Sequence, residues 1–526
     1  MSTGFVWIVG AGPGDPRLLT LKAKECLEQA DVVIYDRLIT PSILAFARPT
    51  AELIYAGKTP NGNSQIHQSA INELLIAKAR EGKKVVRLKN GDPFVFGRGA
   101  EEAEALANAG VPFEIVPGLS SVFAVPAYAG IPLTDRRYAS NFAVGTGHCA
   151  DGKPLPFKKL AKAETVVALM GVSELPKIVA ELIEGGKDPR TPAAIIEWGT
   201  TPNQKTVVAP LAQLPEFAQR YQVQPPAVLV VGEVVRLRDK IAWCERKPLF
   251  GKRILIATTE GQTESLDRKL GDLGAEVIPL PVAKVAPVND KETLSAAIEL
   301  VLQGHYDWVV FTSPQGVRKF FEIAWQFNAD ARSFASIKFA VIGSSTGKEL
   351  QRWGIRFDAM LANCTNGELT ELLITQSIPS HETISSRVQQ PVSRPLRLLL
   401  WRGHGTGEAL AQLLKQAGVD VDEICAYRIV PNHLPSHYLT ALLKEPVHIV
   451  IFADAPSVRA FFTVLGEELV ARVLQNASTF ALDFNTAQTA AQKGLTVSAI
   501  PEIDSLAEAI IQRLSKPNCL SKVEGN

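Results

Sequence analysis

The sequence predicts an α/β protein, because short β-branched strands alternate with amphipathic helical stretches almost throughout its 526 residues. At roughly 150 residues per compact unit, this length predicts about three to four units. A charged, proline-containing joint at Glu245–Gly251 is followed at once by a strand that begins at Arg253, and it marks the main boundary. Representative strands, each bounded by Gly, Pro or Asp, are Val32–Tyr35, Val85–Leu88, Thr165–Leu169 and Ala227–Val231.

The composition excludes several classes of function. The 55 basic residues nearly cancel the 54 acidic ones without long runs of either sign, so no nucleic-acid partner is expected. The six cysteines are scattered without a CxxC pair, and Pro435 separates His433 from His437, so we expect neither a metal site nor a disulfide framework. No apolar run reaches the roughly 18 residues of a membrane span. The first residues run straight into a strand without a signal peptide, so we expect a cytoplasmic protein.

The second half contains an internal duplication, with three segments that recur in the same order at nearly one offset. This pattern predicts two similar α/β lobes with a ligand site between them. Between the copies, Ser377–Pro395 is rich in Ser, Pro and Gln and is typical of a flexible loop. The recurring pairs are 254–257 and 270–277 with 398–401 and 414–421, 309–321 with 450–462, and, more weakly, 343–350 with 483–490.

The first loop imitates a dinucleotide-binding loop and then breaks its pattern. Gly10 and Gly12 follow an apolar strand, but Asp15 stands where a Rossmann loop has its third glycine. A carboxylate there would repel pyrophosphate oxygens, so this loop is predicted to approach a ligand that is not an anionic dinucleotide. We expect Asp15 to cap a helix that begins at Pro16 and continues to about Glu28.

Polar residues follow two neighbouring predicted strands, at the sheet edge where open α/β sheets gather ligands. Asp36 is interpreted either as a general base or as the cap of a turn. Lys58 is either an anion-binding residue or an ordinary lysine in a Gly/Pro loop. In Asn90-Gly-Asp-Pro93, Gly91 allows close backbone approach and Asp92 offers an acceptor, although a plain type I turn explains the same residues.

Residues 1–245 closely resemble the uroporphyrinogen-III C-methyltransferases, S-adenosylmethionine-dependent enzymes that make precorrin-2. The resemblance implies two α/β lobes with the methyl donor in the cleft between them, no metal, and a homodimer formed through this half. The matching motifs, in chain order, are GAGPGD (10–15), LLTLKA (18–23), DVVIYDRL (31–38), AGK (56–58), RLKNGDPFVFGRGAEE (87–102), VPGLSS (116–121), AYAGIPLT (127–134), GTGH (145–148), LMG (169–171), GTTPNQ (199–204) and VVGEVVRLRDKIAW (230–243).

The same resemblance implies roles for individual residues. Asp36 corresponds to the general base and Lys58 to the acid. Because the tetrapyrrole acceptor carries many carboxylates, Arg37 and Arg98 are its expected partners, together with Arg136 and Arg137. Three departures from the usual pattern are Asn90 for Gly, Thr59 for a basic residue and Asp135 for His. The positions implied to hold S-adenosylmethionine are Pro13, Asn90, Gly91, Asp92, Val95, Ser120, Ser121, Met170 and Gly199.

Residues 251–517 resemble the uroporphyrinogen-III synthases, which close hydroxymethylbilane into a ring while inverting its last pyrrole; residues 246–250 would be a linker and 518–526 a tail. The resemblance implies two lobes joined by a two-stranded connection, with Tyr427 nearest to a catalytic role. Asp454 and Asp483 depart from the usual Ser and Gly and bring carboxylates towards an anionic substrate. The matching pieces are FTSPQGV (311–317), VIGSST (341–346), AYR (426–428), FADAPSV (452–458) and DFNTA (483–487), and the implied substrate-binding residues are Thr312, Ser313 and Thr486.

Together the two resemblances predict a bifunctional enzyme that makes uroporphyrinogen III and methylates it twice to precorrin-2, for sirohaem or cobalamin synthesis. Two alternatives stay open. The first half can instead be a methyltransferase that acts later in corrin synthesis. The second half can be a catalytically dead domain that binds a tetrapyrrole and presents it to the methyltransferase, an idea motivated by Asp454 and Asp483.

Overall fold

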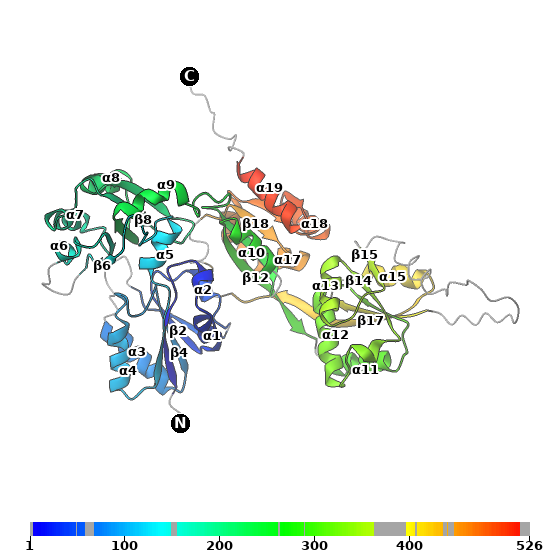
Figure 1. Cartoon of the computed structure of the whole chain (residues 1–526). Helices are drawn as coiled ribbons and strands as arrows, with labels where there is room; N and C mark the ends of the chain where they lie inside the picture. Colours follow the sequence, from blue (N-terminus) through cyan, green and yellow to red (C-terminus); the bar gives the residue numbers. More distant parts are fainter. Residues whose placement is uncertain are drawn as a thin grey trace, which may run out of the picture.

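A computed structural model shows an α/β protein whose described residues form three β-sheets, which confirms the predicted fold class (Figure 1). Lys58, His437, the loop Ser377–Pro395 and the tail 518–526 lie outside the described residues. Within those residues, none of the helices combines the length and the apolar character of a membrane span. The described residues are 4–48, 50–57, 68–148, 155–260, 264–288, 290–361, 396–404, 408–434, 439 and 446–515.

The first sheet is parallel, in the order β3-β2-β4-β1-β5, and helices cover both of its faces. Successive side chains of a strand point to opposite faces of the sheet. Val6 and Ile8 therefore pack in the cluster that includes residues of α3 and α4, whereas Val9 packs with residues of α1 and α2. The strands are β1 (Phe5–Gly10), β2 (Val32–Tyr35), β3 (Glu52–Tyr55), β4 (Lys84–Lys89) and β5 (Phe113–Val116), and the helices are α1 (Leu21–Gln29), α2 (Pro41–Leu44), α3 (Gln68–Arg80) and α4 (Gly99–Asn108).

The predicted first helix is wrong in its extent. Asp15 does cap a helix that begins at Pro16, and its side chain accepts a hydrogen bond from Arg17 N at 2.9 Å. That helix is a single 3-10 turn, Pro16–Leu18, and Leu19 is extended. Thr20 then caps α1 separately by accepting from Ala23 N at 3.1 Å. Thr20, a second capping residue five positions after Asp15, therefore divides the predicted helix into two elements.

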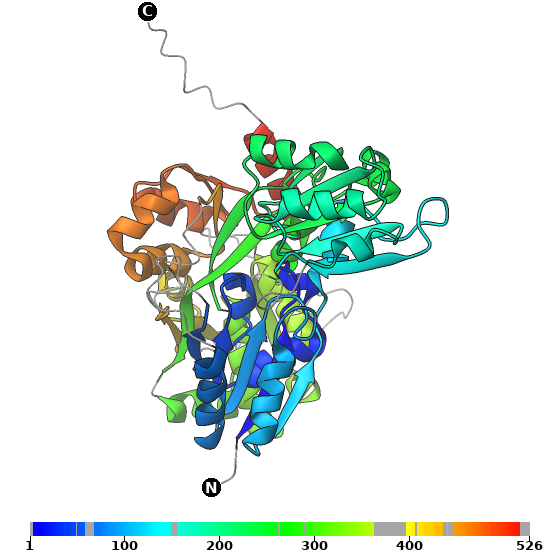
Figure 2. The same ribbon diagram turned by 90° about the vertical axis from the view of Figure 1, so that its left-hand side faces the viewer.

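The second sheet is mixed, in the order β6-β7-β10-β8-β9, and lies above the first sheet in both views (Figures 1 and 2). Helix α5 packs on one face through Val122 and Val125, and α6, α7 and α8 contribute to the cluster on the other. The strands are β6 (Phe142–Thr146), β7 (Thr165–Leu169), β8 (Pro192–Glu197), β9 (Lys205–Pro210) and β10 (Ala227–Val231), and the helices are α5 (Ser121–Tyr128), α6 (Phe157–Leu160), α7 (Leu175–Glu184), α8 (Leu214–Arg220) and α9 (Arg238–Ile241).

The third sheet has ten strands and spans two lobes, in the order β15-β14-β13-β16-β17-β12-β11-β18-β19-β20. Two long strands, β12 (Glu276–Pro287) and β17 (Asp420–Pro431), pair antiparallel over 283–287 and 427–431 and so form the two-stranded connection that the resemblance implies. The other strands are β11 (Arg253–Thr259), β13 (Trp308–Phe311), β14 (Lys338–Ile342), β15 (Ala359–Leu361), β16 (Arg397–Gly403), β18 (Ile449–Phe452), β19 (Ser478–Ala481) and β20 (Val497–Ala499).

The duplication is confirmed, but each lobe combines pieces of both sequence copies. One lobe takes β11 and β12 from the first copy and β18, β19 and β20 from the second, and the other lobe takes the remaining strands. The chain therefore crosses between the lobes twice, once after β12 and once after β17. The helices are α10 (Glu264–Asp272), α11 (Lys291–Leu302), α12 (Pro314–Gln326), α13 (Ser344–Arg352), α15 (Glu408–Gln416), α17 (Ala455–Leu474), α18 (Phe484–Gln492) and α19 (Ile503–Ser515).

Candidate active sites in the two halves

Two glycine-containing loops pair at the carboxyl edge of the first sheet. Gly91 N donates to Gly12 O at 2.8 Å, and Gly12 N donates to Gly91 O at 3.2 Å. The loop after β5 joins them, because Gly118 N donates to Asp92 Oδ2 at 3.1 Å. A Cβ atom on Gly10 would lie 2.5 Å from Gly118 N, so glycine is required where these three loops meet. The structure thus brings together the predicted positions at 13, 90–92 and 120–121.

The remaining positions that are predicted to hold the donor lie on or against the second sheet, which with its helices forms the second lobe of this half. Gly14 adjoins Thr200 and Thr201, which follow Gly199, and a Cβ atom on Gly199 would lie 2.3 Å from Val125 Cγ1. Val95 packs against the apolar cluster of the second sheet, which contains Leu169. Met170, the residue after Leu169, is half-exposed with a left-handed φ of 52°. The first loop therefore touches the segment at 199–201, and Val95 links the two lobes from the loop after β4.

Asp36 lies at the end of β2 and belongs to a buried network of charges. Arg87 Nη2 donates to Asp36 Oδ1 at 2.6 Å, and Arg87 Nε donates to Glu102 Oε1 at 2.9 Å. Lys89 Nζ donates to the same Glu102 oxygen at 2.9 Å, as does Gln68 Nε2 at 3.1 Å. Glu102 is 0% exposed, whereas Asp36 is 31% exposed. The network thus holds one carboxylate in the core and presents the other at the sheet edge.

Sequence reasoning did not single out Arg87, Lys89 or Glu102 for a role. The available signal was the alternation of two basic residues, 87 and 89, inside the apolar strand β4, which places both on one face. Burial lowers the pKa of the Lys89 ammonium from its ordinary value, and the neighbouring Arg87 guanidinium lowers it further. Two buried cations of this kind require carboxylates beside them, and Asp36 and Glu102 meet that need.

The predicted substrate-binding cations of this half differ in their surroundings. Arg37 is exposed, and no ion pair to a described residue engages its guanidinium. Arg98 is exposed too, but its guanidinium is paired with Glu101 at 2.7 Å. Arg137 is paired with Asp135 at 2.9 Å, so the departure from the usual His at 135 does not leave an uncompensated carboxylate.

In the second half, Tyr427 lies where the two-stranded connection meets β16. Its hydroxyl is 2.5 Å from Ser313 Oγ, and that oxygen also accepts from Gly316 N at 3.1 Å as the cap of α12. A Cβ atom on Gly403 would lie 2.7 Å from the Tyr427 ring, so glycine is required there. Burial raises the pKa of Tyr427. Thr312 Oγ1, next to Ser313, is buried and has no hydrogen-bond partner among the described residues.

Asp454 and Asp483 both cap helices. Asp454 accepts from Ser457 N at 2.6 Å at the start of α17, and Asp483 accepts from Thr486 N at 2.7 Å at the start of α18. The Thr486 hydroxyl donates to Asp483 Oδ2 at 2.6 Å, and Thr486 is 0% exposed. The expected contact between this hydroxyl and a substrate is therefore not available in this arrangement. The departure from the usual residue at 483 thus supplies the carboxylate that accepts from the Thr486 hydroxyl.

Asp454→Asn is expected to stabilise the protein at neutral pH. Burial raises the pKa of Asp454, an effect that the nearby Ser457 and Thr259 partly offset, and Oδ2 has no hydrogen bond in the described structure. A raised folded-state pKa means that stability falls as pH rises through it. We expect a gain of about 1–3 kcal/mol at pH 7, because the neutral amide removes the cost of a buried carboxylate charge, and this gain disappears below the ordinary pKa of 3.8, where the carboxyl is protonated in the folded and unfolded states. Urea unfolding at both pH values measures this difference.

Asp483→Asn is the matched control for that prediction, because both carboxylate oxygens of Asp483 already accept hydrogen bonds within its own cap. Asparagine is as good a cap as aspartate. A change in stability with Asp483→Asn equal to that with Asp454→Asn would contradict the assignment of the effect to the buried charge of Asp454.

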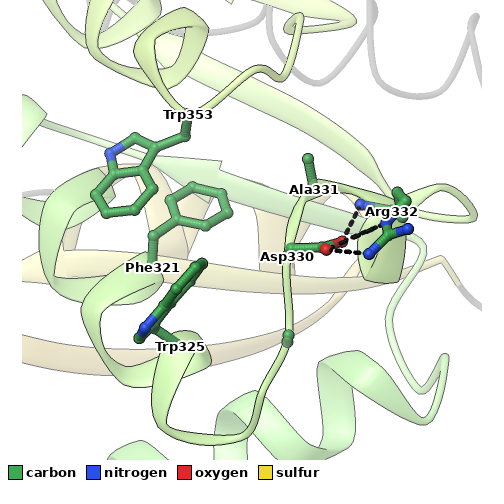
Figure 3. A pocket seen from close by; sticks show the side chains of 7 residues that line it. Phe321, Trp325, Asp330, Ala331, Arg332 and Trp353 are labelled. Atoms are coloured by element: carbon green, nitrogen blue, oxygen red, sulfur yellow. Dashed lines mark hydrogen bonds and ion pairs between the residues drawn. The ribbon is translucent and has the colours of Figure 1, made fainter.

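A separate apolar pocket of about 340 Å³ lies at the C-terminal ends of α12 and α13 (Figure 3). Phe321 stacks on Trp353 there with 5.1 Å between ring centroids, and an Asp330–Arg332 ion pair stands opposite. It contains none of the predicted site residues. Among the described residues, no group of three His, Cys, Asp or Glu gathers as a metal site requires.

Comparisons with known proteins cover both halves. The family of tetrapyrrole (corrin/porphyrin) methylases matches residues 6–215, and the family of uroporphyrinogen-III synthase HemD matches residues 264–510. The chain is 34% identical over 518 residues to "Porphyrin biosynthesis protein HemD" of Ruminiclostridium josui, which covers 97% of this chain and 98% of that one. It is 40% identical over 364 residues to the uroporphyrinogen-III C-methyltransferase of Bacillus subtilis, covering 68% of this chain and 74% of the relative.

A solved structure is similar over the first half. It is the uroporphyrin-III C-methyl transferase from Thermus thermophilus in complex with S-adenyl homocysteine, and its sequence is 43% identical. The match has a TM-score of 0.40 and covers 44% of this chain and 94% of that one. The fold and the comparisons define an enzyme of tetrapyrrole biosynthesis with a methyltransferase domain and a HemD-type domain. The chain belongs to the family in which a tetrapyrrole methylase is fused to a uroporphyrinogen-III synthase of the HemD type, as the resemblances predicted.

Proposed function

We propose that the chain catalyses two consecutive reactions. Residues 251–517 cyclise hydroxymethylbilane to uroporphyrinogen III, and residues 1–245 transfer two methyl groups to that product, giving precorrin-2 for sirohaem or cobalamin synthesis. The presence and order of the two families in one chain support this pairing. The observation that carries the methyl-transfer proposal is the edge where Gly12 and Gly91 pair close to the end of β2, which carries Asp36.

The proposed methyl donor is S-adenosylmethionine, whose sulfonium cation supplies an activated methyl group. The glycines of the paired loops allow a ligand to approach the backbone closely. The carboxylate of Asp92 beside these loops is compatible with a cation, whereas it would repel a diphosphate; the carboxylate of Asp15 is instead paired with Arg17. We propose donor contacts at Pro13, Asn90, Gly91, Asp92, Val95, Ser120, Ser121, Met170 and Gly199.

In the proposed reaction a pyrrole carbon attacks the methyl carbon, the carbon–sulfur bond breaks, and the ring proton passes to Asp36. Arg87 holds Asp36 Oδ1 at 2.6 Å, so the carboxylate is fixed at the sheet edge with its other oxygen turned towards Lys89 at 4.0 Å. Because Asp36 is already fixed in place, the base and the bound acceptor do not have to find their relative orientation during the reaction, and this contributes to the rate. Lys58 is proposed as the acid, and Arg37 and Arg98 as partners of substrate carboxylates.

One assay tests the methyl-transfer proposal. Purified full-length protein is incubated with uroporphyrinogen III and S-adenosylmethionine, and the product mass is measured. We expect the acceptor to gain two methyl groups. A methyltransferase that acts later in corrin synthesis would leave uroporphyrinogen III unmodified, and that result would refute the proposal.

For the second half we propose that the Tyr427 hydroxyl, held by Ser313, acts at the reacting end of the linear substrate, with Thr312 and Ser313 binding its carboxylate groups. Tyr427→Phe is expected to reduce synthase turnover about a hundredfold, the scale of one lost proton-transfer group. The ratio of ring isomers formed from hydroxymethylbilane measures this loss. Tyr306→Phe is the matched control, because Tyr306 is also buried and donates to Asp422 at 2.8 Å. Equal losses in the two variants would refute a specific role for Tyr427.

The alternative of a dead binding domain rests on the carboxylates of Asp454 and Asp483. Each carboxylate accepts a hydrogen bond from a backbone N–H at the start of its own helix. This capping reduces the expected repulsion between the two carboxylates and a polycarboxylate substrate. Wild-type protein that forms only the non-inverted ring isomer from hydroxymethylbilane would favour the dead domain over the synthase.

A further inference from the structure

The joint between the two halves, with Trp243 that precedes it, is linked through single side chains to both segments that are proposed to hold the methyl donor. Asp15, at the end of the first glycine loop, is 8% exposed. Its carboxylate accepts hydrogen bonds from Arg17 N at 2.9 Å, Arg17 Nη2 at 3.0 Å and Tyr128 Oη at 2.9 Å. Burial raises the pKa of Tyr128, and Asp15 raises it further, so the tyrosine stays protonated and donates. The loop is therefore anchored through this one carboxylate.

Arg17 extends this anchor into the second half of the chain. Its Nη1 atom lies 3.2 Å from Asp272 Oδ1, at the end of α10, while Nη2 and Nε remain on Asp15. One guanidinium thus connects a carboxylate of the methyltransferase half to a carboxylate of the synthase half. Planar guanidinium groups suit such a bridge because their donors diverge in a fixed geometry.

Trp243, two residues before the joint, supplies a second route to the same loop. Trp243 packs edge-on against Tyr128 at 5.1 Å between ring centroids, and Trp243 Nε1 donates to Ala127 O at 3.0 Å. On its other side, Leu249 is fully buried in the core of the synthase half, and its backbone N donates to Leu273 O at 2.9 Å. The chain from Trp243 to Leu249 is therefore fixed to both halves.

A third contact reaches the donor segment of the second lobe. Glu245 accepts from Gln204 Nε2 at 2.8 Å, and the buried Gln204 in turn accepts from Thr200 N at 2.9 Å. Thr200 follows Gly199, one of the proposed donor contacts. Arg238 forms an ion pair with the other oxygen of Glu245. Each donor segment is thus linked to this part of the chain through one intervening side chain, Tyr128 for the first loop and Gln204 for the segment at 199–201.

These contacts form a closed ring that runs from Asp15 through Tyr128, Trp243, the joint, Leu273, Asp272 and Arg17 back to Asp15. A closed ring restrains the loop from two directions, whereas a single exposed ion pair restrains little. We propose that Arg17 is a positioning residue through which the docked synthase half holds the donor loop in its binding conformation. This inference rests on the proposed use of a methyl donor at that loop.

Asp272→Arg in the full-length protein tests this inference without altering the methyltransferase half. The substitution places a cation opposite Arg17 at a residue that is 66% exposed and ends a helix, where a cation is favourable. We expect the Kd for S-adenosylhomocysteine, measured by titration calorimetry, to rise about three- to fivefold. We also expect faster hydrogen exchange in peptides that cover residues 10–19. In an Arg17→Ala background, Asp272→Arg should have no further effect, since the two residues act through one contact.

Asp504→Arg is the matched control, because Asp504 is 80% exposed and pairs with Lys269 of the same helix α10. It makes the same charge change on the same lobe and should leave both measurements unchanged. Wild-type exchange rates in 10–19 for Asp272→Arg would overturn the coupling, as would equal effects of the two substitutions. Because exchange needs no donor, it decides the coupling even if the wild type fails to bind S-adenosylhomocysteine, a result that would instead refute the proposed function.

Discussion

Glu102→Ala is expected to destabilise the first lobe by about 3–5 kcal/mol, the usual result of removing one partner from a buried ion pair. The substitution leaves Arg87 and Lys89 buried and opposite Asp36 alone. Two cations would then share one carboxylate in a region of low dielectric, where an uncompensated charge is most costly. Urea unfolding, with native-state hydrogen exchange of peptides from β1 and β4, measures the loss in that lobe.

The neighbouring residue provides the control for this prediction. Glu101 stands next to Glu102 on α4, but its pair with Arg98 is exposed. Glu101→Ala should change stability by less than about 1 kcal/mol, as exposed pairs do. Equal, small losses for the two variants would show that the charges at 87, 89 and 102 do not depend on one another.

Asp36→Ala is expected to lower methyl-transfer turnover about a hundred- to ten-thousandfold, the range that a positioned general base contributes. Donor affinity should change little, because the proposed donor contacts lie on the glycine loops and the second lobe. Asp36→Asn keeps an acceptor for Arg87 and should lose turnover to a similar degree. Single-turnover kinetics with uroporphyrinogen III, together with calorimetric binding of S-adenosylhomocysteine, separate the two effects.

Asp188→Ala, which removes an exposed carboxylate paired with Arg190, serves as the control for overall integrity. If Asp36→Ala binds the donor as the wild type does and turns over at the wild-type rate, Asp36 is a turn residue rather than the base. That was the alternative interpretation of this position from the sequence alone.

Local patterns predicted the α/β class, and strands such as Val32–Tyr35, Thr165–Leu169 and Ala227–Val231 were predicted with their correct bounds, because short apolar runs depend on nearby residues. The duplication was also visible in the sequence, yet its arrangement was not. The exchange of strands between lobes depends on β12 and β17 crossing from one lobe to the other, and long-range pairing of that kind leaves no local signal. The helix after Asp15 was predicted too long because Thr20 competes as a second cap.

Strand ends predicted which loops would meet in the first half. Residues 12, 36 and 91 follow parallel strands of one sheet, so their loops had to share an edge. The buried partners of Asp36 were missed because Glu102 lies in the first turn of a helix, where acidic residues are common without any buried partner. The bridge from Arg17 to Asp272 joins two exposed side chains 255 positions apart, and no periodicity could have indicated it.

The most direct test of the two proposed activities is to supply purified full-length protein with hydroxymethylbilane and S-adenosylmethionine together, and to determine the mass and ring isomer of the product. We expect a single main product that carries two added methyl groups on the inverted, type III ring. Accumulation of unmethylated uroporphyrinogen III would contradict the role of the first half, and formation of only the non-inverted ring would contradict that of the second.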